Sequence, residues 1–532
     1  MNHAVLENQT HESTEEGNVP DASNVSVSFP LTKILATLGP STDNEETLFK
    51  LIRSGVTNFR LNFSHGDFEN HAMRLALVRS CAATLGRPVS VLGDLQGPKI
   101  RVGSIPDPGF DLPAGEKVII SVHPRAVPID RGGAEEASII NCTYEKLPQE
   151  VEPGHRVLIN DGAIRMLCVD RDEFSITCTV TYGGRVSSRK GINLPDSSLS
   201  VCALTDQDIE YVHWAIANQL DFLALSFVRY ADDVRRLREI VVSNCTRDSC
   251  GVGFDGADSD PIIPIIVKIE TPQAVENIDE IIEIANGLMI ARGDLGVEMD
   301  VAAVPVIQKK LVKIAHSHGK PCIVATQMLE SMIERATPTR AEVSDVANAI
   351  LDRADCVMLS GETAVGKYPV LAADTMRRVA LATEQAIRDD DTQARPPSLP
   401  QGTGNLTWAL AHGAWHVAKD VDAKLVVVWS QTGGTARSLS RNGFDVAVIA
   451  FSSDQRAIQR MNLLYSVIPV YLTDPPEHRS EFAELVDQLV LEHGWANRSD
   501  TVLLMAGKPL GVGGRTNTLA IRNIGELTPD LH

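Results

Sequence analysis

Charged residues follow two apolar segments near the middle of the chain, where they could bind a metal ion and an anion together. The first segment, Ile266–Glu270, contains a lysine and ends in a glutamate, and the second, Ile290–Gly296, contains an arginine, a glycine and an aspartate. A buried strand that ends at an active site typically has this pattern. The carboxylates of Glu270 and Asp294 could hold a hard divalent cation such as Mg²⁺, and Lys268 could hold an anion beside it. Together these groups favour phosphoryl or enolate chemistry.

Eight strand-like runs alternate with amphipathic segments, which predicts an α/β fold built on a closed, parallel TIM barrel. The runs are nearly all apolar, as expected for strands that are covered on both faces. They are Lys33–Gly39, Asn58–Ser64, Val89–Gln96, Asp221–Phe227, Pro264–Glu270, Gly287–Gly293, Pro321–Gln327 and Cys356–Glu362. The amphipathic segments between them include Thr47–Ser54, Asp206–Asn218, Gln273–Ala285, Val304–His318 and Ser344–Arg353.

Polar residues stand at the carboxyl ends of these strands, where a barrel of this kind carries its catalytic groups. They are Arg60, Asn62, Ser64, His65, Asp94, Lys99, Arg101, Ser226, Arg229, Lys268, Glu270, Arg292, Asp294, Thr326, Gln327, Ser360 and Glu362. Any single residue could be a salt bridge at the barrel rim or a helix cap, and Arg292 and Glu362 are expected to be structural partners. The joint pattern favours an active site.

Three other regions interrupt or flank the barrel pattern. Residues 103–188 form an all-β insertion after the third barrel strand and could cover the barrel mouth as a lid. Residues 389–404 are acidic and rich in proline, as in a linker, and residues 405–532 contain a smaller α/β unit. Residues 1–28 are expected to be a disordered tail, which leaves residues 29–102 and 189–388 for the catalytic barrel.

The short strands expected in these regions are Lys117–Val122, Arg156–Leu158, Ala163–Val169 and Phe174–Thr181 in the insertion, and Lys424–Trp429, Ala447–Phe451, Val467–Tyr471, Thr501–Ala506 and Thr518–Ile524 in the C-terminal unit. The segment Asn244–Asp260 is expected to be a surface loop rich in glycine, aspartate and serine, and it suggests no chemistry.

Composition indicates a soluble globular protein and excludes several classes of partner. Apolar residues make up 43% of the chain and charged residues 22%. A formal net charge of -20 argues against a general nucleic-acid or anionic-membrane surface. No apolar run reaches the ~18 residues of a membrane span, and the N-terminal segment does not resemble a signal peptide. The nine scattered cysteines are interpreted as reduced thiols, and a cytoplasmic location is expected.

Several long motifs resemble those of the pyruvate kinase family, from about residue 29 to the C-terminus. They are TKILATLGPST (Thr32–Thr42), FRLNFSHG (Phe59–Gly66), GDLQGPKIR (Gly93–Arg101), RKGINLP (Arg189–Pro195), VKIETPQAVENIDEI (Val267–Ile281), IARGDLGVE (Ile290–Glu298), ATQMLESM (Ala325–Met332) and MLSGETAVGKYP (Met358–Pro369). The resemblance implies a TIM barrel, an inserted β-barrel lid and a regulatory C-terminal α/β domain. It also implies phosphoryl transfer from phosphoenolpyruvate to ADP, which yields ATP and pyruvate in glycolysis.

The resemblance further implies a role for each matching residue. Arg60 contacts the transferring phosphate, Lys268 stabilises the transition state, and Glu270 and Asp294 hold Mg²⁺. The amides of Gly293 and Asp294 bind the substrate carboxylate together with Thr326. The nucleotide is expected to bring a second Mg²⁺ and to contact Asn62, His65, Arg101 and Lys190. A relay near Thr326 and Ser360 would protonate the enolate of pyruvate.

One motif departs from the pattern of the K⁺-dependent members. Those members bind K⁺ at the positions of Asn62, Ser64, Asp94 and the carbonyl of Leu95, and they usually carry glutamate where this chain has Lys99. The sequence GPKIR resembles the K⁺-independent class, in which a lysine supplies the charge of the cation. Activity without K⁺ is therefore expected, and the alternative is that Lys99 points to solvent and the pocket still fills.

The predicted effector loop of the C-terminal unit also departs from the family. Where the family resembles TKSGRSA, this chain reads SQTGGTA, with Gln431 and Gly434 at the basic positions. Hydroxyls and glycine remain at Ser430, Thr432, Gly433 and Thr435, and Arg437 and Arg515 remain as basic residues for this loop. The loop could bind a sugar monophosphate or AMP rather than a bisphosphate, or it could bind no effector.

Two other functions remain open at this point. A Mg²⁺-dependent barrel lyase or aldolase acting on an enolpyruvate would share Glu270 and Asp294 but would not need Arg101 or Lys190. A non-catalytic paralogue would be expected to lack one or more of the catalytic residues, and all of them are present. The family also implies a homotetramer.

Overall fold

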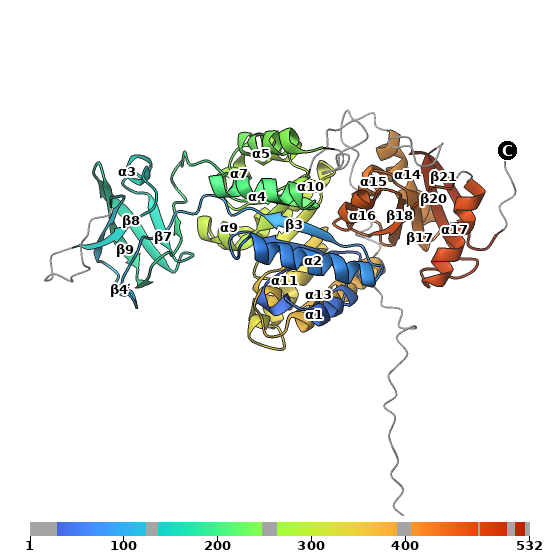
Figure 1. Ribbon diagram of the computed structural model, residues 1–532, viewed down its shortest axis with the longest axis horizontal. Coiled ribbons are helices and arrows are strands. Elements are labelled where there is room, and N and C mark those ends of the chain that lie inside the picture. The colour runs from blue at the N-terminus through green and yellow to red at the C-terminus, as the bar shows by residue number, and fades with distance from the viewer. Residues whose placement is uncertain are drawn as a thin grey trace, which may run out of the picture.

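The computed structural model describes residues 29–123, 137–246, 263–390, 406–476, 479–507 and 516–526. Figure 1 shows three regions along the long axis of the molecule, with the β-rich insertion at one end, the barrel in the middle and the C-terminal α/β unit at the other end. The insertion and the C-terminal unit therefore contact opposite sides of the barrel.

A closed barrel of eight parallel strands forms the centre of the molecule, as the sequence predicts. Around the barrel the strands follow the order β1-β16-β15-β14-β13-β12-β3-β2. Each barrel strand therefore pairs with the barrel strands that come before and after it along the chain, and the last strand, β16, pairs with the first, β1. The strands are β1 (Lys33–Thr37), β2 (Val56–Asn62), β3 (Ser90–Asp94), β12 (Phe222–Leu225), β13 (Ile265–Ile269), β14 (Gly287–Ala291), β15 (Cys322–Ala325) and β16 (Cys356–Leu359). Most strand residues are fully buried, because helices cover the outside and side chains fill the inside.

The helices around the barrel carry an apolar face toward the strands, and α1, α2, α4, α7 and α11 begin at a side-chain cap, formed by Asn44, Asp67, Thr205, Thr271 and Thr339. They are α1 (Glu45–Arg53), α2 (Phe68–Thr84), α4 (Asp206–Ala217), α5 (Ala231–Asn244), α7 (Pro272–Glu276), α8 (Ile278–Ile284), α9 (Arg292–Glu298), α10 (Val304–Ser317), α11 (Arg340–Leu351), α12 (Gly361–Ala364) and α13 (Pro369–Asp389). Two short 3₁₀ helices, η1 (Pro40–Thr42) and η2 (Glu330–Ile333), follow β1 and β15.

Two helices differ from the sequence prediction. The expected helix Gln273–Ala285 is divided at Asn277, whose side-chain amide donates to the carbonyls of Arg229 (3.1 Å) and Gln273 (2.9 Å). Helix α11 begins four residues before the predicted start, because Thr339 and Glu342 form a reciprocal capping box. The Thr-x-x-Glu spacing that produces this cap is visible in the sequence.

The insertion contains more strands than its hydrophobic pattern predicts. Its main sheet has six strands in the order β11-β7-β8-β9-β5-β6, and β10 pairs with β4 in a second, two-stranded sheet. The two sheets share one apolar core, to which Leu112 of β4 and Val186 of β10 contribute. The elements are β4 (Phe110–Leu112), β5 (Lys117–Ser121), β6 (Ser138–Asn141), α3 (Leu147–Glu150), β7 (Arg156–Ile159), β8 (Ile164–Arg171), β9 (Ser175–Tyr182), β10 (Gly184–Val186) and β11 (Ile192–Asn193).

The C-terminal unit is a five-stranded sheet with helices on both faces (Figure 1). The strand order is β19-β18-β17-β20-β21, and only the last pair, β20 and β21, is antiparallel. The elements are α14 (Leu406–Asp420), β17 (Leu425–Trp429), α15 (Gly434–Ser440), β18 (Ala447–Ser452), α16 (Gln455–Met461), β19 (Val467–Tyr471), α17 (Arg479–Glu492), β20 (Thr501–Gly507) and β21 (Thr516–Asn523). All five strands expected here are present, with small differences at their ends.

The C-terminal unit closes the end of the barrel at which the strands begin. Leu463 is 1% exposed and belongs to the same buried cluster as the inward-facing barrel residues Leu35 and Leu92. Beside it, the Lys33 ammonium donates to the carbonyl of Val467 (2.6 Å), and the Asn58 amide donates to the carbonyl of Asn462 (3.1 Å). Residues 462–467 therefore form the floor of the barrel.

Seven cysteines of the described chain are free, but Cys245 is disulfide-bonded. The expectation that every cysteine is a reduced thiol is therefore wrong for Cys245, which follows α5 at the start of a segment that lies mostly outside the described residues. Within the described ranges, no helix is both long enough and apolar enough to span a membrane. The predicted tail, residues 1–28, and most of the predicted linker also lie outside the described residues.

Candidate active site

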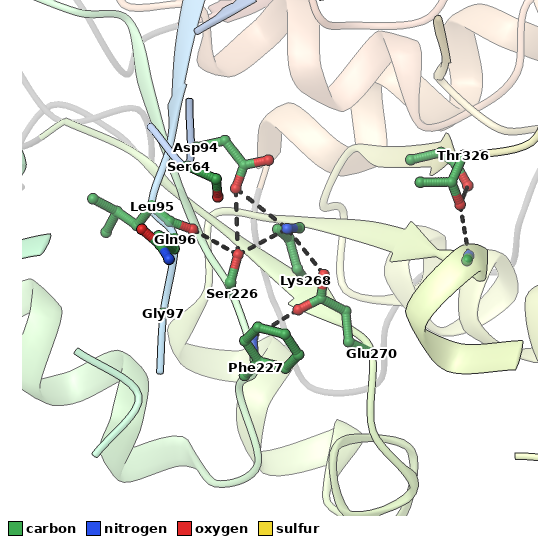
Figure 2. A network of polar contacts seen from close by, with 12 residues as sticks. Ser64, Asp94, Leu95, Gln96, Gly97, Ser226, Phe227, Lys268, Glu270 and Thr326 are labelled. Atoms are coloured by element: carbon green, nitrogen blue, oxygen red, sulfur yellow. Dashed lines mark hydrogen bonds and ion pairs between the residues drawn. The ribbon is translucent and has the colours of Figure 1, made fainter. Parts of the chain in front are cut away.

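Lys268 stands at the centre of a polar network at the carboxyl end of the barrel (Figure 2). Its ammonium lies 2.9 Å from Oε1 of Glu270 and 3.3 Å from Oδ1 of Asp94, and it donates to Oγ of Ser226 at 2.8 Å. Burial lowers the pKa of Lys268, but the two carboxylates more than offset that effect and hold the pKa above its usual value. Lys268 is therefore a fixed positive charge at any physiological pH.

Arg60 provides a second positive charge from the end of β2. Its Nε lies 2.6 Å from Oδ2 of Asp94, and its Nη1 donates to Oγ1 of Thr37 at 3.3 Å. Asp94 is 1% exposed, and burial alone would raise its pKa, but Lys268 and Arg60 together hold the pKa below the usual value. One buried carboxylate thus positions two cations side by side, which suits a site for a phosphoryl group.

The end of β12 connects the network to two neighbouring strands. The Ser226 hydroxyl, which accepts from Lys268, donates to the carbonyl of Leu95 at 2.7 Å. Phe227 has a left-handed backbone (φ +53°), and its N–H donates to Oε2 of Glu270 at 2.7 Å. The sequence places Ser226 at a strand end but gives it no role, and the structure shows that it fixes Lys268.

Two carboxylates have the chemistry of a Mg²⁺ site. Glu270 is 1% exposed; burial is the main cause that raises its pKa, and the nearby negative charge of Asp294 raises it further. Lys268 and the Phe227 amide oppose that rise without cancelling it. A divalent cation bound by both carboxylates would relieve this repulsion, so the residues present fit the ion that the sequence predicts.

Thr326 and Gly293 meet on the other side of the mouth (Figure 2). The Gly293 amide donates to Oγ1 of Thr326 at 2.7 Å, and the same hydroxyl donates to the carbonyl of Ala325 at 2.6 Å. Thr326 has a φ of +69°, a backbone that is rare for a β-branched residue and that costs energy.

Arg292 holds Thr326 in that conformation. The arginine is 8% exposed; its Nη2 donates to the Thr326 carbonyl at 2.8 Å, and its Nη1 donates to Asp345 at 2.8 Å. Arg292 thus lies beneath the site and joins the Thr326 carbonyl to Asp345 of helix α11, which is a structural role. Glu362 is also structural, since it accepts from the amides of Leu329 (3.0 Å) and Ser360 (2.7 Å). Within the described residues no bond joins it to Arg292, so the expected partnership of these two residues is wrong.

The Ser360 hydroxyl lies at the end of β16. Its Oγ is buried and has no hydrogen-bond partner among the described residues. A buried hydroxyl usually finds a partner in protein or water, so this atom has capacity left for a water or a ligand.

Predicted nucleotide-binding residues line the approach from the lid. Arg101 and Lys190 lie on the two chain segments that join the lid to the barrel, and the amide of Val102 donates to the carbonyl of Lys190 at 2.8 Å. The Arg101 guanidinium donates to the carbonyl of Arg189 at 3.0 Å. His65 is exposed at the end of β2. Both basic residues therefore lie at the junction of lid and barrel.

Three of the four predicted ligands of a monovalent cation already have other partners. Asp94 pairs with two cations, the carbonyl of Leu95 accepts from Ser226, and Oδ1 of Asn62 accepts from the Ser64 amide at 3.2 Å. Lys99 is exposed, and its methylene end packs against Gly191 of the lid. Lys99 lines a separate pocket between lid and barrel together with Asn193, Asp294 and Glu298.

Asn193 and Glu298 connect the lid directly to the wall of the site. The amide of Asn193 in β11 donates to Oε1 of Glu298 at 2.8 Å, and Glu298 is the last residue of α9, the helix that carries Asp294. Burial is the main cause that raises the pKa of Glu298 to about 7, and Asp294 adds to it. Further along the same lid connection, the guanidinium of Arg229 donates to the carbonyls of Leu199 and Val201.

Sequence reasoning missed Asn193, Glu298 and also Asp208. The Asp208 carboxylate accepts from the Gln96 amide at 2.9 Å and from Thr205, the cap of α4, so it fixes the loop after β3. The Thr-x-x-Asp spacing of a capping box was the available signal for Asp208. No pattern marks Asn193 and Glu298, because their pairing depends on how the lid lies against the barrel.

The predicted effector loop lies between β17 and α15. Gly433 has a left-handed backbone (φ +85°), the Ser430 hydroxyl accepts from the Ala436 amide at 3.1 Å, and the Thr435 and Thr516 hydroxyls are 2.6 Å apart. Gln431 donates to Ser453 at 2.9 Å. Thr432 lies in the same loop, and Arg515 lies outside the described residues.

Two family models match almost the whole described chain. The model for the barrel domain of pyruvate kinase covers residues 29–373, and the model for its α/β domain covers residues 408–522. The chain belongs to the pyruvate kinase family. A pyruvate kinase of Mycobacterium intracellulare is 38% identical over 494 residues, which are 93% of this chain and 98% of the relative. A pyruvate kinase of Thermotoga maritima is 35% identical over 93% of this chain and 99% of the relative.

A solved structure agrees with the sequence matches. The crystal structure of a pyruvate kinase from Cryptosporidium parvum superposes with a TM-score of 0.82 at 33% identity, and covers 97% of this chain and 100% of that chain. The agreement extends over barrel, insertion and C-terminal unit, so the pyruvate kinase fold is present in full.

Proposed function

We propose that this chain transfers the phosphoryl group of phosphoenolpyruvate to ADP at the carboxyl end of the barrel, as befits a pyruvate kinase. The observation that carries the proposal is the pair of cations held by one buried carboxylate, with Lys268 at 3.3 Å and Arg60 at 2.6 Å from Asp94. Two fixed positive charges at one point stabilise a phosphoryl group whose negative charge spreads over its oxygens during transfer.

Lys268 and Arg60 would bind the transferring group from two sides. Because Asp94 and Ser226 hold the Lys268 ammonium before substrate arrives, little reorganisation is needed at the moment of reaction. Glu270 and Asp294 would hold Mg²⁺, which when bound supplies a Lewis acid for the phosphate and enolate oxygens.

The substrate carboxylate would bind at the Gly293 and Asp294 amides beside Thr326. The Gly293 amide now donates to the Thr326 hydroxyl, so the carboxylate would replace or share that bond. The enolate left after transfer needs a proton on carbon, and a relay through Thr326, Ser360 and water would provide it. The unpartnered Ser360 hydroxyl supports this route, whereas the Thr326 proton is directed at the Ala325 carbonyl in this state.

ADP would bind between the barrel mouth and the lid, near Asn62, His65, Arg101 and Lys190, with a second Mg²⁺. Lid closure would exclude the water that competes with ADP for the phosphoryl group. The lid connections support the idea, because Arg101 and Lys190 lie on the segments that must move when the lid closes.

Lys268→Met tests the proposal. Removal of the ammonium should lower kcat for pyruvate formation from phosphoenolpyruvate and ADP by at least about a thousandfold, the scale of losing a central charged group. The far-UV spectrum and the melting temperature show whether the fold survives. Near-normal turnover in a folded variant would refute the role of Lys268, and pyruvate release without ADP would point instead to a lyase.

We also propose that turnover needs no K⁺. The GPKIR sequence supports this, and so does the pairing of Asp94 with two protein cations. The Lys99 ammonium would have to turn from Gly191 toward the cation pocket. Movement of the lid would release it from Gly191 and allow this turn.

Kinetics in buffer free of Na⁺ and K⁺ test this second proposal. Wild-type turnover should change less than about twofold on adding KCl, whereas Lys99→Glu should become dependent on K⁺, since it exchanges a positive for a negative charge. Strong activation of the wild type by KCl would contradict it.

The remaining proposals concern regulation and assembly. A sugar monophosphate or AMP would bind at the loop of Ser430, Thr432, Gly433 and Thr435, and the protein would work as a cytoplasmic homotetramer. Saturation kinetics with a panel of sugar phosphates and AMP test the effector, and sedimentation measures the assembly. No shift in half-saturation with any of them would favour a loop without an effector.

A further inference from the structure

Two cysteines face each other across adjacent strands of the lid. Cys168 in β8 and Cys178 in β9 are direct partners in the antiparallel register. Their side chains point into the lid core, where they are 1% and 0% exposed. The site lies apart from the network around Lys268, and nothing in the proposed reaction uses it.

The backbone shows which kind of cross-strand pair this is. The Cys168 amide donates to the carbonyl of His155 (2.9 Å), and the Cys168 carbonyl accepts from the amide of Gly154 (2.8 Å). Both groups point to the segment before β7, and therefore away from β9. Cys168 and Cys178 thus form a non-hydrogen-bonded pair, whose Cα atoms lie ~4.5 Å apart with their side chains close together. That separation falls within the range that disulfides span.

The two thiols also interact with each other. A hydrogen bond with Cys178 is the largest cause acting on Cys168, and it lowers the pKa of the Cys168 thiol against the effect of burial. The same contact, together with burial, raises the pKa of Cys178. Cys168 is thereby the better nucleophile, and Cys178 is placed to react with whatever forms on it.

We propose that Cys168 and Cys178 form a reversible disulfide within the lid when the protein meets a two-electron oxidant such as hydrogen peroxide. The Cys168 thiolate attacks one peroxide oxygen, which breaks the O–O bond, gives a sulfenic acid and releases water after proton uptake. The Cys178 sulfur then attacks the sulfenic sulfur, and the S–O bond breaks to release a second water. Two thiols are oxidised and one peroxide is reduced.

Cys142 provides a matched control within the same core. It is 7% exposed, and its sulfur accepts from the Tyr144 amide at 3.4 Å rather than from a second cysteine. It shares the burial of the pair but lacks a thiol across the strand.

The experiment treats the native full-length chain with hydrogen peroxide, alkylates the remaining thiols and maps the peptides by mass spectrometry. A peptide joining Cys168 to Cys178, lighter by two hydrogen atoms, is expected in wild type and in Cys142→Ala. It should vanish on treatment with dithiothreitol and be absent from Cys168→Ala and Cys178→Ala.

Three results would overturn the proposal. Cys168 and Cys178 could both remain alkylatable in the treated native protein, they could oxidise separately to sulfinic acids, or they could join only after unfolding in guanidinium. Circular dichroism of each variant shows that it has folded, and the wild-type and Cys142→Ala results decide the question even if an alanine variant of the pair does not fold.

Discussion

At the residue scale, the key side chains of the site each contact more than one partner. Asp94 serves two cations, and the Ser226 hydroxyl joins Lys268 to the loop after β3. A variant at Asp94 would move both cations and one at Ser226 would move Lys268, so their effects on catalysis should not be additive with those of Lys268. The proposed catalytic unit is the network of Asp94, Ser226, Lys268 and Glu270 (Figure 2).

Glu298 should make stability depend on pH near neutrality. Its pKa is about 7 in the folded chain, raised chiefly by burial, so the folded state favours the protonated form. The stabilisation from that proton is complete below the ordinary pKa near 4.5 and is lost as pH rises through 7. Glu298→Gln keeps the acceptor for Asn193 without the charge. Its free energy of unfolding, relative to that of wild type, should therefore rise by up to roughly 3 kcal/mol between the two pKa values.

Melting temperatures in magnesium-free buffer from pH 5 to 8 measure this effect of Glu298. Glu298→Gln should melt increasingly above wild type as pH rises, and a constant difference would contradict the assignment. Glu46→Gln, the same exchange at an exposed carboxylate whose pKa is lowered by its hydrogen bond with Lys50, gives a control without that trend.

Sequence alone placed most of these side chains at one end of the barrel but did not show how they pair. Lys268, Glu270 and Asp94 could be predicted because a parallel barrel gathers the residues that follow its strands at one end. The sharing of Asp94 by Lys268 and Arg60 could not, since it depends on side-chain geometry across three strands. Glu298 was likewise hidden, because its partner Asn193 belongs to a different domain.

At the scale of the elements, long periodic segments were predictable and short ones were not. All eight barrel strands were found because each is a buried apolar run of several residues. Strands β4, β10 and β11 of the lid have only two or three residues, too few to show a period. Helix α7–α8 was read as one helix because its division rests on hydrogen bonds from Asn277 to backbone carbonyls.

The loop after β15 should be sensitive to Arg292, although that residue lies beneath the site. Arg292→Lys keeps the charge but cannot bond Thr326 and Asp345 with the same planar fork. We expect kcat to fall about ten- to a hundredfold through displacement of Thr326, with a smaller change in nucleotide KM.

Steady-state kinetics with each substrate varied separately measure this effect. Arg340→Lys, at the exposed start of α11, is a matched exchange that should leave kcat unchanged. An unchanged kcat in Arg292→Lys would show that Thr326 keeps its conformation without the guanidinium.

At the scale of the whole molecule, the barrel and the C-terminal unit share a core. Leu463 contributes to the barrel cluster, whereas its neighbour Leu464 packs within the C-terminal unit, and both are 1% exposed. The two units are therefore not independent bodies joined only by a linker, even though their sheets are separate.

Leu463→Ala should destabilise the barrel, although Leu463 belongs to the C-terminal unit. Removing a fully buried leucine costs roughly 2–5 kcal/mol, and faster amide exchange is expected in β1 and β3, whose residues Leu35 and Leu92 line the same cluster. Leu464→Ala should instead affect the sheet of the C-terminal unit. Hydrogen exchange read by mass spectrometry separates the two, and equal protection of β1 and β3 in wild type and Leu463→Ala would contradict the expectation.

The left-handed residues at the barrel mouth set a limit for anyone who wishes to make this protein more heat-resistant. Thr326 and Phe227 hold backbone conformations that glycine adopts at lower cost. A screen that rewards survival at high temperature would favour glycine there, and at Thr326 it would discard the hydroxyl together with the strain. Selection for robustness alone would thus erode turnover, so the two properties have to be scored in the same experiment.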